Sequence, residues 1–491
     1  MKNSNQFLII FAVGIVIGCH ILLSKNADAK NSNAKNIATK HEQIEKTHHD
    51  YLKLEQIIKS SQKNYPLILN YYEKVTAQEG GVMANKGFFD IRIKNQYQDK
   101  TRGFYDGKLN NFSIEKNNGF MGSKIYGGYR RSSGDFASYD GDNYTNNEGE
   151  YRIGGSISLL RDRSIDNARL NFFNSQLDLK ESQVQLKKIK QEIARDATKS
   201  YWSWVVAGYI FQAYEELYNL AKKRDDQLKI LNQKGDIAKI IVTENYRNIL
   251  TRQSLMQEAK NNFDNSAINL SMYHRNLDGE PLIASINELP KIDFNLEKNF
   301  INNLDKDIQH ALESRPELQI LQIQIQQENN NLSQAKNLYQ PRLDLSFEAS
   351  KDEGKGPSSR SQSNNNLKID FELPIQQNIA KGKILSTSSK IKAFQYEQQF
   401  YRDKIRNEIL QLNNSLNNVL KIYHNYLEEV KLSRTLEKAE KERFDNGHSN
   451  FFLINLREQE VTSARINKLI TLLKYQSFIA DYNYAVFRAN E

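Results

Sequence analysis

Apolar residues recur at helical spacing over two unusually long stretches of the chain. Residues 166–231 read as continuous helix, and residues 382–445 carry apolar positions spaced alternately by four and three. This heptad spacing of period 3.5 is typical of helices that pack in a left-handed supercoil. Its positions are Ile405, Ile409, Leu412, Leu416, Val419, Tyr423, Tyr426 and Val430. About 65 residues at a rise of 1.5 Å predict rods of roughly 100 Å.

Prolines and glycines set the limits of these helices. Residues 67–280 and 375–491 contain no proline, and proline breaks helix interiors. Each rod ends at a glycine turn, at Gly235 or Gly447, after which a shorter helix is expected. The four shorter helical stretches, of which the first and third are interrupted at Pro66 and Pro316, are predicted at about 51–86, 240–273, 300–338 and 451–488.

Strict alternation of apolar and charged residues predicts strands between the helices. Residues 342–349 and 366–373 alternate in this way and predict a hairpin. The first half has a longer β segment, from Phe89 to Ile157, with further candidate strands near 109–116 and 120–130. One apolar face and one charged face are expected where a barrel has lipid outside and water inside.

The two halves of the chain repeat one order of elements, which predicts an internal duplication. Each half reads as helix, strands, long helix, glycine turn and helix. Pro66 and Pro316 differ by 250 positions, whereas Gly235 and Gly447 differ by 212, because the first β segment is longer. Each half supplies only a few strands. A barrel in lipid must be closed, so several chains are expected to share one barrel.

The N-terminus predicts an export signal. Residues 7–18 are uncharged and mostly apolar and follow a short segment with one lysine. Three alternatives stay open. The residues before Cys19 resemble a lipobox, which would place cleavage after residue 18 and a lipid on Cys19. Ala27-Asp28-Ala29 fits ordinary cleavage after Ala29. Residues 7–23 could also stay as an uncleaved anchor.

Composition narrows the class of protein. The chain of 491 residues has 68 Lys and Arg against 59 Asp and Glu, and the two signs are interleaved, so no nucleic-acid partner is expected. The single Cys excludes a disulfide scaffold and a Cys-based zinc site. No catalytic set and no phosphate-binding loop is found, so we expect no enzyme activity, no metal and no cofactor. Tyr201, Trp202 and Trp204 are interpreted as packing aromatics.

Several segments resemble the TolC-type outer membrane factor family. They are Arg315-Pro316-Glu317-Leu318, AKNLYQPRLDLSFE at 335–348, Arg443-Phe444-Asp445-Asn446-Gly447 followed by FFLINLREQ at 451–459, and GDIAKIIVTENYRNIL at 235–250. The resemblance covers about residues 51–488. It implies a mainly α fold with β: a long α-helical coiled-coil barrel plus hairpins of a transmembrane β-barrel, internally duplicated.

The resemblance implies a homotrimeric channel-tunnel in the outer membrane of a Gram-negative cell, with a periplasmic helical domain. The shared barrel is twelve-stranded in its typical form. The expected partners are further copies of the chain, outer membrane lipid, a periplasmic adaptor and an inner-membrane transporter. The duct is passive and serves efflux or type I secretion. The long first β segment leaves two alternatives: more than twelve strands, or extra strands standing above the membrane.

This reading divides the chain into eight segments. They are a signal peptide at 1–29 (or 1–18 in a lipoprotein), a polar linker at 30–50, the first N-terminal helix at 51–88, the first β segment at 89–160, the first periplasmic helices at 161–290, the second N-terminal helix at 291–340, the second hairpin at 341–374 and the second periplasmic helices at 375–491.

The candidate site residues lie at the tip of the helices. Many family members carry Asp six and nine positions after the second tip glycine, where this chain has Leu453 and Leu456, so an acidic ring is not expected. The residues expected at the adaptor-docking tip are Gly235, Gly447, Phe451 and Phe452. The residues expected at the tunnel constriction are Glu244, Asn455, Arg457 and Glu458. Loosening this tip, for example by Arg457→Ala, is expected to raise channel conductance.

A periplasmic coiled-coil scaffold or adaptor is the competing reading. It accounts for the long helices and for an anchored N-terminus. It does not account for the alternating hairpin at 342–373, because a scaffold needs no strands that face lipid.

Overall fold

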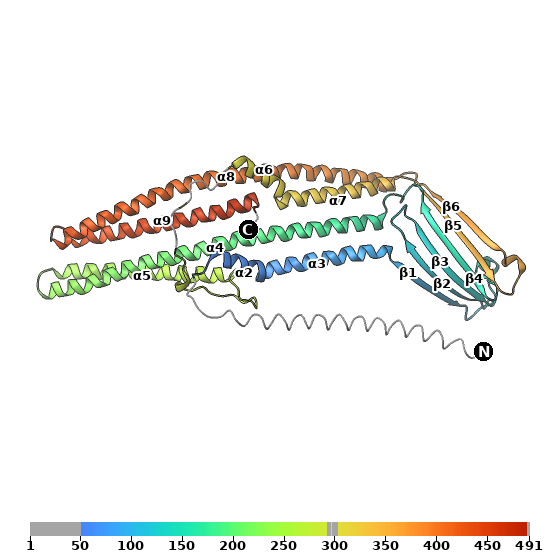
Figure 1. Ribbon diagram of the computed structural model, residues 1–491, viewed down its shortest axis with the longest axis horizontal. Coiled ribbons are helices and arrows are strands. Elements are labelled where there is room, and N and C mark those ends of the chain that lie inside the picture. Colours follow the sequence, from blue (N-terminus) through green and yellow to red (C-terminus); the bar gives the residue numbers. More distant parts are fainter. Residues whose placement is uncertain (1–50, 292–295, 297–302, 489–491) are drawn as a thin grey trace. The chain divides into compact units, whose positions relative to one another are not determined.

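The computed structural model describes residues 51–291, 296 and 303–488. The chain divides into two units, residues 1–51 and residues 52–491, and the elements below belong to the second. The predicted export signal, including Cys19, and the polar linker lie outside the described residues. Figure 1 shows long helices and a set of strands that lie side by side.

Among the described residues, the first part of the chain forms two helices, four strands and two further helices. The helices are α2 (Leu54–Asn64), α3 (Pro66–Lys86), α4 (Asn167–Gln233) and α5 (Lys239–Ser271). The strands are β1 (Ile91–Asp99), β2 (Lys108–Asn117), β3 (Lys124–Ser133) and β4 (Gly149–Ser158). Three short 3-10 helices are η1 (Gly87–Phe89), η2 (Ser138–Asn143) and η3 (Ile286–Glu288).

The second part takes up the same order of elements with two strands in place of four. The helices are α6 (Leu304–Ser314), α7 (Pro316–Leu338), α8 (Asn378–Asp445) and α9 (Phe451–Val486). The strands are β5 (Arg342–Glu353) and β6 (Ser363–Glu372), and η4 (Ser358–Arg360) lies between them. The long helices predicted from the sequence are thus confirmed in α4 and α8.

The heptad positions of α8 form its packed face. Six of the eight positions are buried, and Leu412 and Tyr426 are half-buried. Ile405, Ile409 and Leu416 belong to one apolar cluster with residues of α9 such as Tyr482. Burial of this stripe against α9 holds the second helical hairpin together, because each large apolar side chain contributes about 1.5–3 kcal/mol when it leaves water.

Aromatic residues form the core between α4 and α5. Trp204 is fully buried, and its ring stacks on Phe263 with 6.4 Å between the ring centroids. The Tyr201 hydroxyl donates a hydrogen bond of 2.9 Å to the Leu52 carbonyl. The interpretation of Tyr201 and Trp204 as packing aromatics is confirmed by their burial.

Each proline break starts a new helix. Pro66 opens α3 and Pro316 opens α7, where the missing N–H of proline leaves no intrahelical bond unmade. Arg315 fills the second break: it is buried, and its guanidinium donates to the Ala485 carbonyl at 3.2 Å. The same guanidinium pairs with Glu317 at 3.1 Å and Glu408 at 3.3 Å. The break therefore anchors α6 and α7 to α8 and to the end of α9.

All six strands form one antiparallel sheet in sequence order, β1 to β6. The four helix ends that border the strands belong to α3, α4, α7 and α8 (Figure 1). The strand predicted near 120–130 begins later, at Lys124, because Met121 and Gly122 adopt positive φ in a tight turn. Within the described helices, none combines the length and apolar character that crossing a membrane requires.

Candidate functional site

One face of the sheet is apolar over all six strands. Residues directly opposite each other in antiparallel strands project to the same face, so the register defines this face. Its exposed apolar side chains are Ile91, Ile93 and Tyr97 on β1, Phe112 and Ile114 on β2, Ile125 on β3, Tyr151 and Ile153 on β4, Phe347 on β5, and Leu367, Ile369 and Phe371 on β6. An exposed apolar surface of this extent indicates contact with a membrane or a partner.

The opposite face of the sheet is polar and is crossed by charged pairs between strands. Glu115 on β2 pairs with Lys94 on β1 and with Lys124 on β3. The Tyr126 hydroxyl donates to a Glu348 carboxylate oxygen at 2.5 Å, which links β3 to β5 across β4. Glu115 is itself buried and its charge is balanced by the two lysines, whose side chains remain 57% and 42% exposed.

Two glycine turns close the helical hairpins. Gly235 joins α4 to α5 with φ of +84°, and Gly447 joins α8 to α9 with φ of +76°. The Asp236 N–H donates to the Leu231 carbonyl at 2.9 Å, and the His448 N–H donates to the Arg443 carbonyl at 2.8 Å. This is the Schellman pattern, which ends a helix through a left-handed residue.

Because Gly447 adopts a left-handed conformation, replacing it by a residue with a side chain should lower the stability of the fold. A Cβ at this position meets no atom within 4 Å, so Gly447→Ala should destabilise the fold through backbone strain alone, by about 1–2 kcal/mol. Gly382→Ala is the matched control, because Gly382 lies inside α8 with equal space. It should stabilise the helix by about 1 kcal/mol. Urea unfolding measures the change in unfolding free energy for both variants. Changes in the same direction would contradict the left-handed turn at Gly447.

A buried ionic network joins the two helical hairpins near these turns. The Glu458 carboxylate on α9 pairs with Arg224 on α4 and with Arg252 on α5, the latter at 3.1 Å. The Asn455 Oδ1 accepts from Arg224 at 2.9 Å and from Arg252 at 3.1 Å. Arg252 also donates to the Leu217 carbonyl at 3.1 Å. The side chains of Glu458, Arg252 and Arg224 are only 4%, 7% and 9% exposed.

Burial and charge act in opposite directions within this network. Burial lowers the pKa of the Arg252 guanidinium, and the Glu458 carboxylate opposes this by favouring the charged form. Two arginines share one carboxylate, so the cluster depends on Glu458 for its charge balance.

A second polar pair lies beside it on the α4–α5 hairpin. Asp225 is buried, which opposes its ionisation, but hydrogen bonds from Lys229 and Asn245 hold its pKa below the ordinary value. The Asn245 amide donates to Asp225 Oδ1 at 2.9 Å. The turn end of this hairpin is therefore fixed by polar contacts rather than by a wide apolar core.

The structure brings together two of the four residues expected at a constriction. Asn455 and Glu458 lie in the buried network. Arg457 instead pairs with Glu460 at 2.9 Å on its own helix, and Glu244 pairs with Arg247 at 2.5 Å on its own helix.

The two tip phenylalanines differ in environment. Phe451 is half-buried, with the Arg224 guanidinium 5.7 Å from its ring centroid. Phe452 is 68% exposed. Adjacent residues at the start of α9 thus supply one ring to the network and one to the surface.

Sequence reasoning missed Arg224 and Arg252. A signal for the first exists: Arg224 lies eleven positions before Gly235, and Glu458 lies eleven positions after Gly447. Opposite charges at equal distances from two tip turns become neighbours when the hairpins pack with their tips level. No comparable spacing identifies Arg252, which reaches Glu458 from α5.

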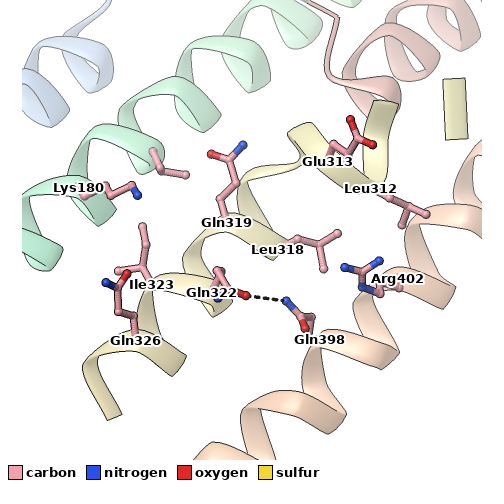
Figure 2. A pocket seen from close by; sticks show the side chains of 11 residues that line it. Lys180, Leu312, Glu313, Leu318, Gln319, Gln322, Ile323, Gln326, Gln398 and Arg402 are labelled. Atoms are coloured by element: carbon pink, nitrogen blue, oxygen red, sulfur yellow. Dashed lines mark hydrogen bonds between the residues drawn. The ribbon is translucent and has the colours of Figure 1, made fainter. Parts of the chain in front are cut away.

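A hollow of about 340 Å³ lies where the junction of α6 and α7 meets α4 and α8 (Figure 2). Figure 2 shows glutamines around it, with Gln398 donating to Gln322 at 3.5 Å. Across the residues that the structure describes, no group of three or more His, Cys, Asp or Glu side chains could hold a metal ion.

No protein-family model matches the sequence, and a search among curated proteins finds no match. Solved structures do match. The Campylobacter jejuni CmeC outer membrane channel is 14% identical, with a TM-score of 0.61 over 90% of each chain. The Vibrio cholerae outer membrane protein VceC is 9% identical, with a TM-score of 0.62 over 89% of this chain and 97% of that one.

The open-state Neisseria gonorrhoeae MtrE outer membrane channel is 12% identical, with a TM-score of 0.61 over 89% of this chain and 90% of that one. At these identities the likeness concerns the fold. The chain therefore has a TolC-type channel fold, and that expectation from the sequence is confirmed.

Proposed function

We propose that this protein is the outer membrane channel-tunnel of a tripartite efflux or type I secretion system. Three copies form a passive exit duct, whose barrel lies in the outer membrane of a Gram-negative cell and whose helices cross the periplasm. The observation that carries this proposal is the exposed apolar face, continuous over six strands and backed by a charged face. A lipid-embedded barrel with a polar lumen has this pattern.

The helices suit a periplasmic tunnel. α4 has 67 residues and α8 has 68, and at 1.5 Å per residue each is about 100 Å long. In this proposal the export signal directs the chain out of the cytoplasm, and Cys19 is a candidate site for lipid attachment. The internal duplication supplies each copy with two helical hairpins of similar build, one in each half.

The tips are the proposed docking place for a periplasmic adaptor that connects to an inner-membrane transporter. Gly235, Gly447 and the exposed Phe452 form the contact surface, with Phe451 beneath it. Asn455 and Glu458 hold the two hairpins of one copy together and so narrow the tunnel. Glu244 and Arg457 supply further charge at the same constriction.

Extraction in mild detergent tests this proposal. The expected product is a trimer near three times 57.0 kDa, less the export signal, seen in electron images as a tapered tube below a micelle belt. Migration in detergent gels should change on heating, because the barrel must melt. A monomer or dimer that salt releases without detergent would instead support a periplasmic scaffold.

A further inference from the structure

The sheet ends at two long strands whose outer edges have no strand partner among the described residues. β1 has nine residues and β6 has ten, and each pairs on one side only. Long edges of this kind present unpaired N–H and C=O groups that template pairing with another chain. β1 and β6 run in opposite directions because an even number of strands separates them, so they can pair antiparallel.

The extra strands of the first β segment belong to the same membrane-facing surface as the others. Ile93 on β1 lies opposite Ile114 on β2, and Ile125 on β3 lies opposite Lys116 and Gly155. The apolar face thus reaches from β1 to β6 without a change of side. A hairpin that stood above the membrane would have no reason to present exposed isoleucines on this face.

We propose that β1 of one copy pairs with β6 of the next, so that three copies close a barrel of eighteen strands. This inference rests on the proposed trimer and extends it. The three-fold arrangement and the six-stranded sheet together give the strand number. Barrels of about 16–18 strands are wide enough to leave an aqueous channel.

One register of the new pair satisfies both faces at once. If Lys94 of β1 lies opposite Asp370 of β6, then Arg92 lies opposite Glu372 on the polar face. The same register sets Ile93 opposite Phe371 on the apolar face. Opposite charges and apolar pairs directly across two strands each contribute roughly 0.2–1 kcal/mol.

The same register gives a reasonable barrel geometry. Across one copy, the row of opposed residues starts at Ile91 and ends at Leu367. In the proposed register Leu367 lies opposite Tyr97 of the next copy, which is six residues beyond Ile91. Three such steps stagger eighteen strands by eighteen residues. With a rise of about 3.4 Å and strands about 4.8 Å apart, the strands tilt about 35°, within the usual range.

The direction of the stagger also agrees with the hand of β-barrels. The Lys100 N–H donates to the carbonyl of Gly107, the residue opposite it, so polar-face residues of β1 bond to β2. Apolar-face residues then direct their backbone groups to the free edge. When the sheet is viewed from its apolar face with β1 pointing upward, L-residues with this bonding pattern place β2 to the left of β1. In a barrel of right-twisted strands, the row of opposed residues must then return to β1 nearer its C-terminal end, as it does from Ile91 to Tyr97 in the proposed register.

Disulfide cross-linking tests the closure in the intact protein. Lys94→Cys and Asp370→Cys are combined in one chain, and the outer membrane fraction is oxidised mildly. Most of the protein should migrate as a covalent trimer on non-reducing gels and as a monomer after reduction. Lys94→Cys with Asn364→Cys is the matched control, because Asn364 projects to the same face about 20 Å away along β6. Each single-cysteine variant controls for Cys19.

Native mass measurement of the same samples separates the two levels of the proposal. A trimer that fails to cross-link at these positions would overturn the eighteen-strand closure and leave the proposed exit duct standing. A monomer would overturn both. Electron microscopy of the trimer gives a second readout, since a cross-section with twelve strands would contradict the closure and one with eighteen would support it.

Discussion

Glu458→Ala should lower the free energy of unfolding by about 3–5 kcal/mol, because it leaves Arg224 and Arg252 buried without their carboxylate. Denaturant unfolding of the detergent-solubilised protein measures the loss. In correctly assembled trimers the same variant should raise single-channel conductance in planar bilayers, since the link between the hairpins is gone. The conductance result depends on the proposed exit duct, whereas the stability result does not.

Glu460→Ala provides the control on the same helix. Its partner Arg457 lies on α9 as well, and both side chains are partly in water, so the cost should stay below about 0.5 kcal/mol. Because Arg457 pairs within its own helix, we expect the increase in conductance from Glu458→Ala rather than from Arg457→Ala. A double-mutant cycle between Glu458→Gln and Arg224→Gln should show coupling of about 0.5–3 kcal/mol. Additive effects, or a larger loss from Glu460→Ala, would contradict the network.

Arg224 and Arg252 are absent from the residues expected at the tip for a physical reason. Asn455 and Glu458 are expected there from the resemblance, because they lie beside the positions at which many members of that family carry Asp. Arg224 and Arg252 reach them from another hairpin, more than 200 positions away. Such pairing depends on the relative height of two hairpins. The equal spacing of Arg224 and Glu458 from the two tip glycines indicates that height, but no such spacing exists for Arg252.

Sequence alternation predicts some strands of the sheet better than others. Strict alternation identified β5 and β6, because each carries apolar and charged residues in turn over most of its length. β3 contains Gly127 and Gly128 in its interior, and β4 contains Gly154 and Gly155. These glycines interrupt the alternation without ending the strands, because the ladder uses only backbone groups. Alternation in the sequence therefore does not give the register of β3 and β4 in the sheet, which the backbone pairing shows.

Buried tyrosines should make the helical core sensitive to alkali. Burial raises the pKa of Tyr201 to about 12, with Tyr209 adding to the effect, and burial likewise raises the pKa of Tyr273 to about 12. An unfolded tyrosine releases its proton near pH 10. Between about pH 10 and 12 the unfolded chain therefore binds fewer protons than the folded one. Stability is full below pH 10 and falls with rising pH, by about 1 kcal/mol per unit for each such tyrosine.

Tyr201→Phe isolates one of these groups. At pH 8 the variant should be about 1 kcal/mol less stable than the unaltered protein, because the hydrogen bond to the Leu52 carbonyl is lost. The unaltered protein then loses about 2 kcal/mol at this tyrosine between pH 10 and 12, and the variant does not. The two stability curves, measured by denaturant unfolding with circular dichroism, should cross in this interval. Parallel curves would show that the Tyr201 hydroxyl ionises as readily in the folded chain as in the unfolded one.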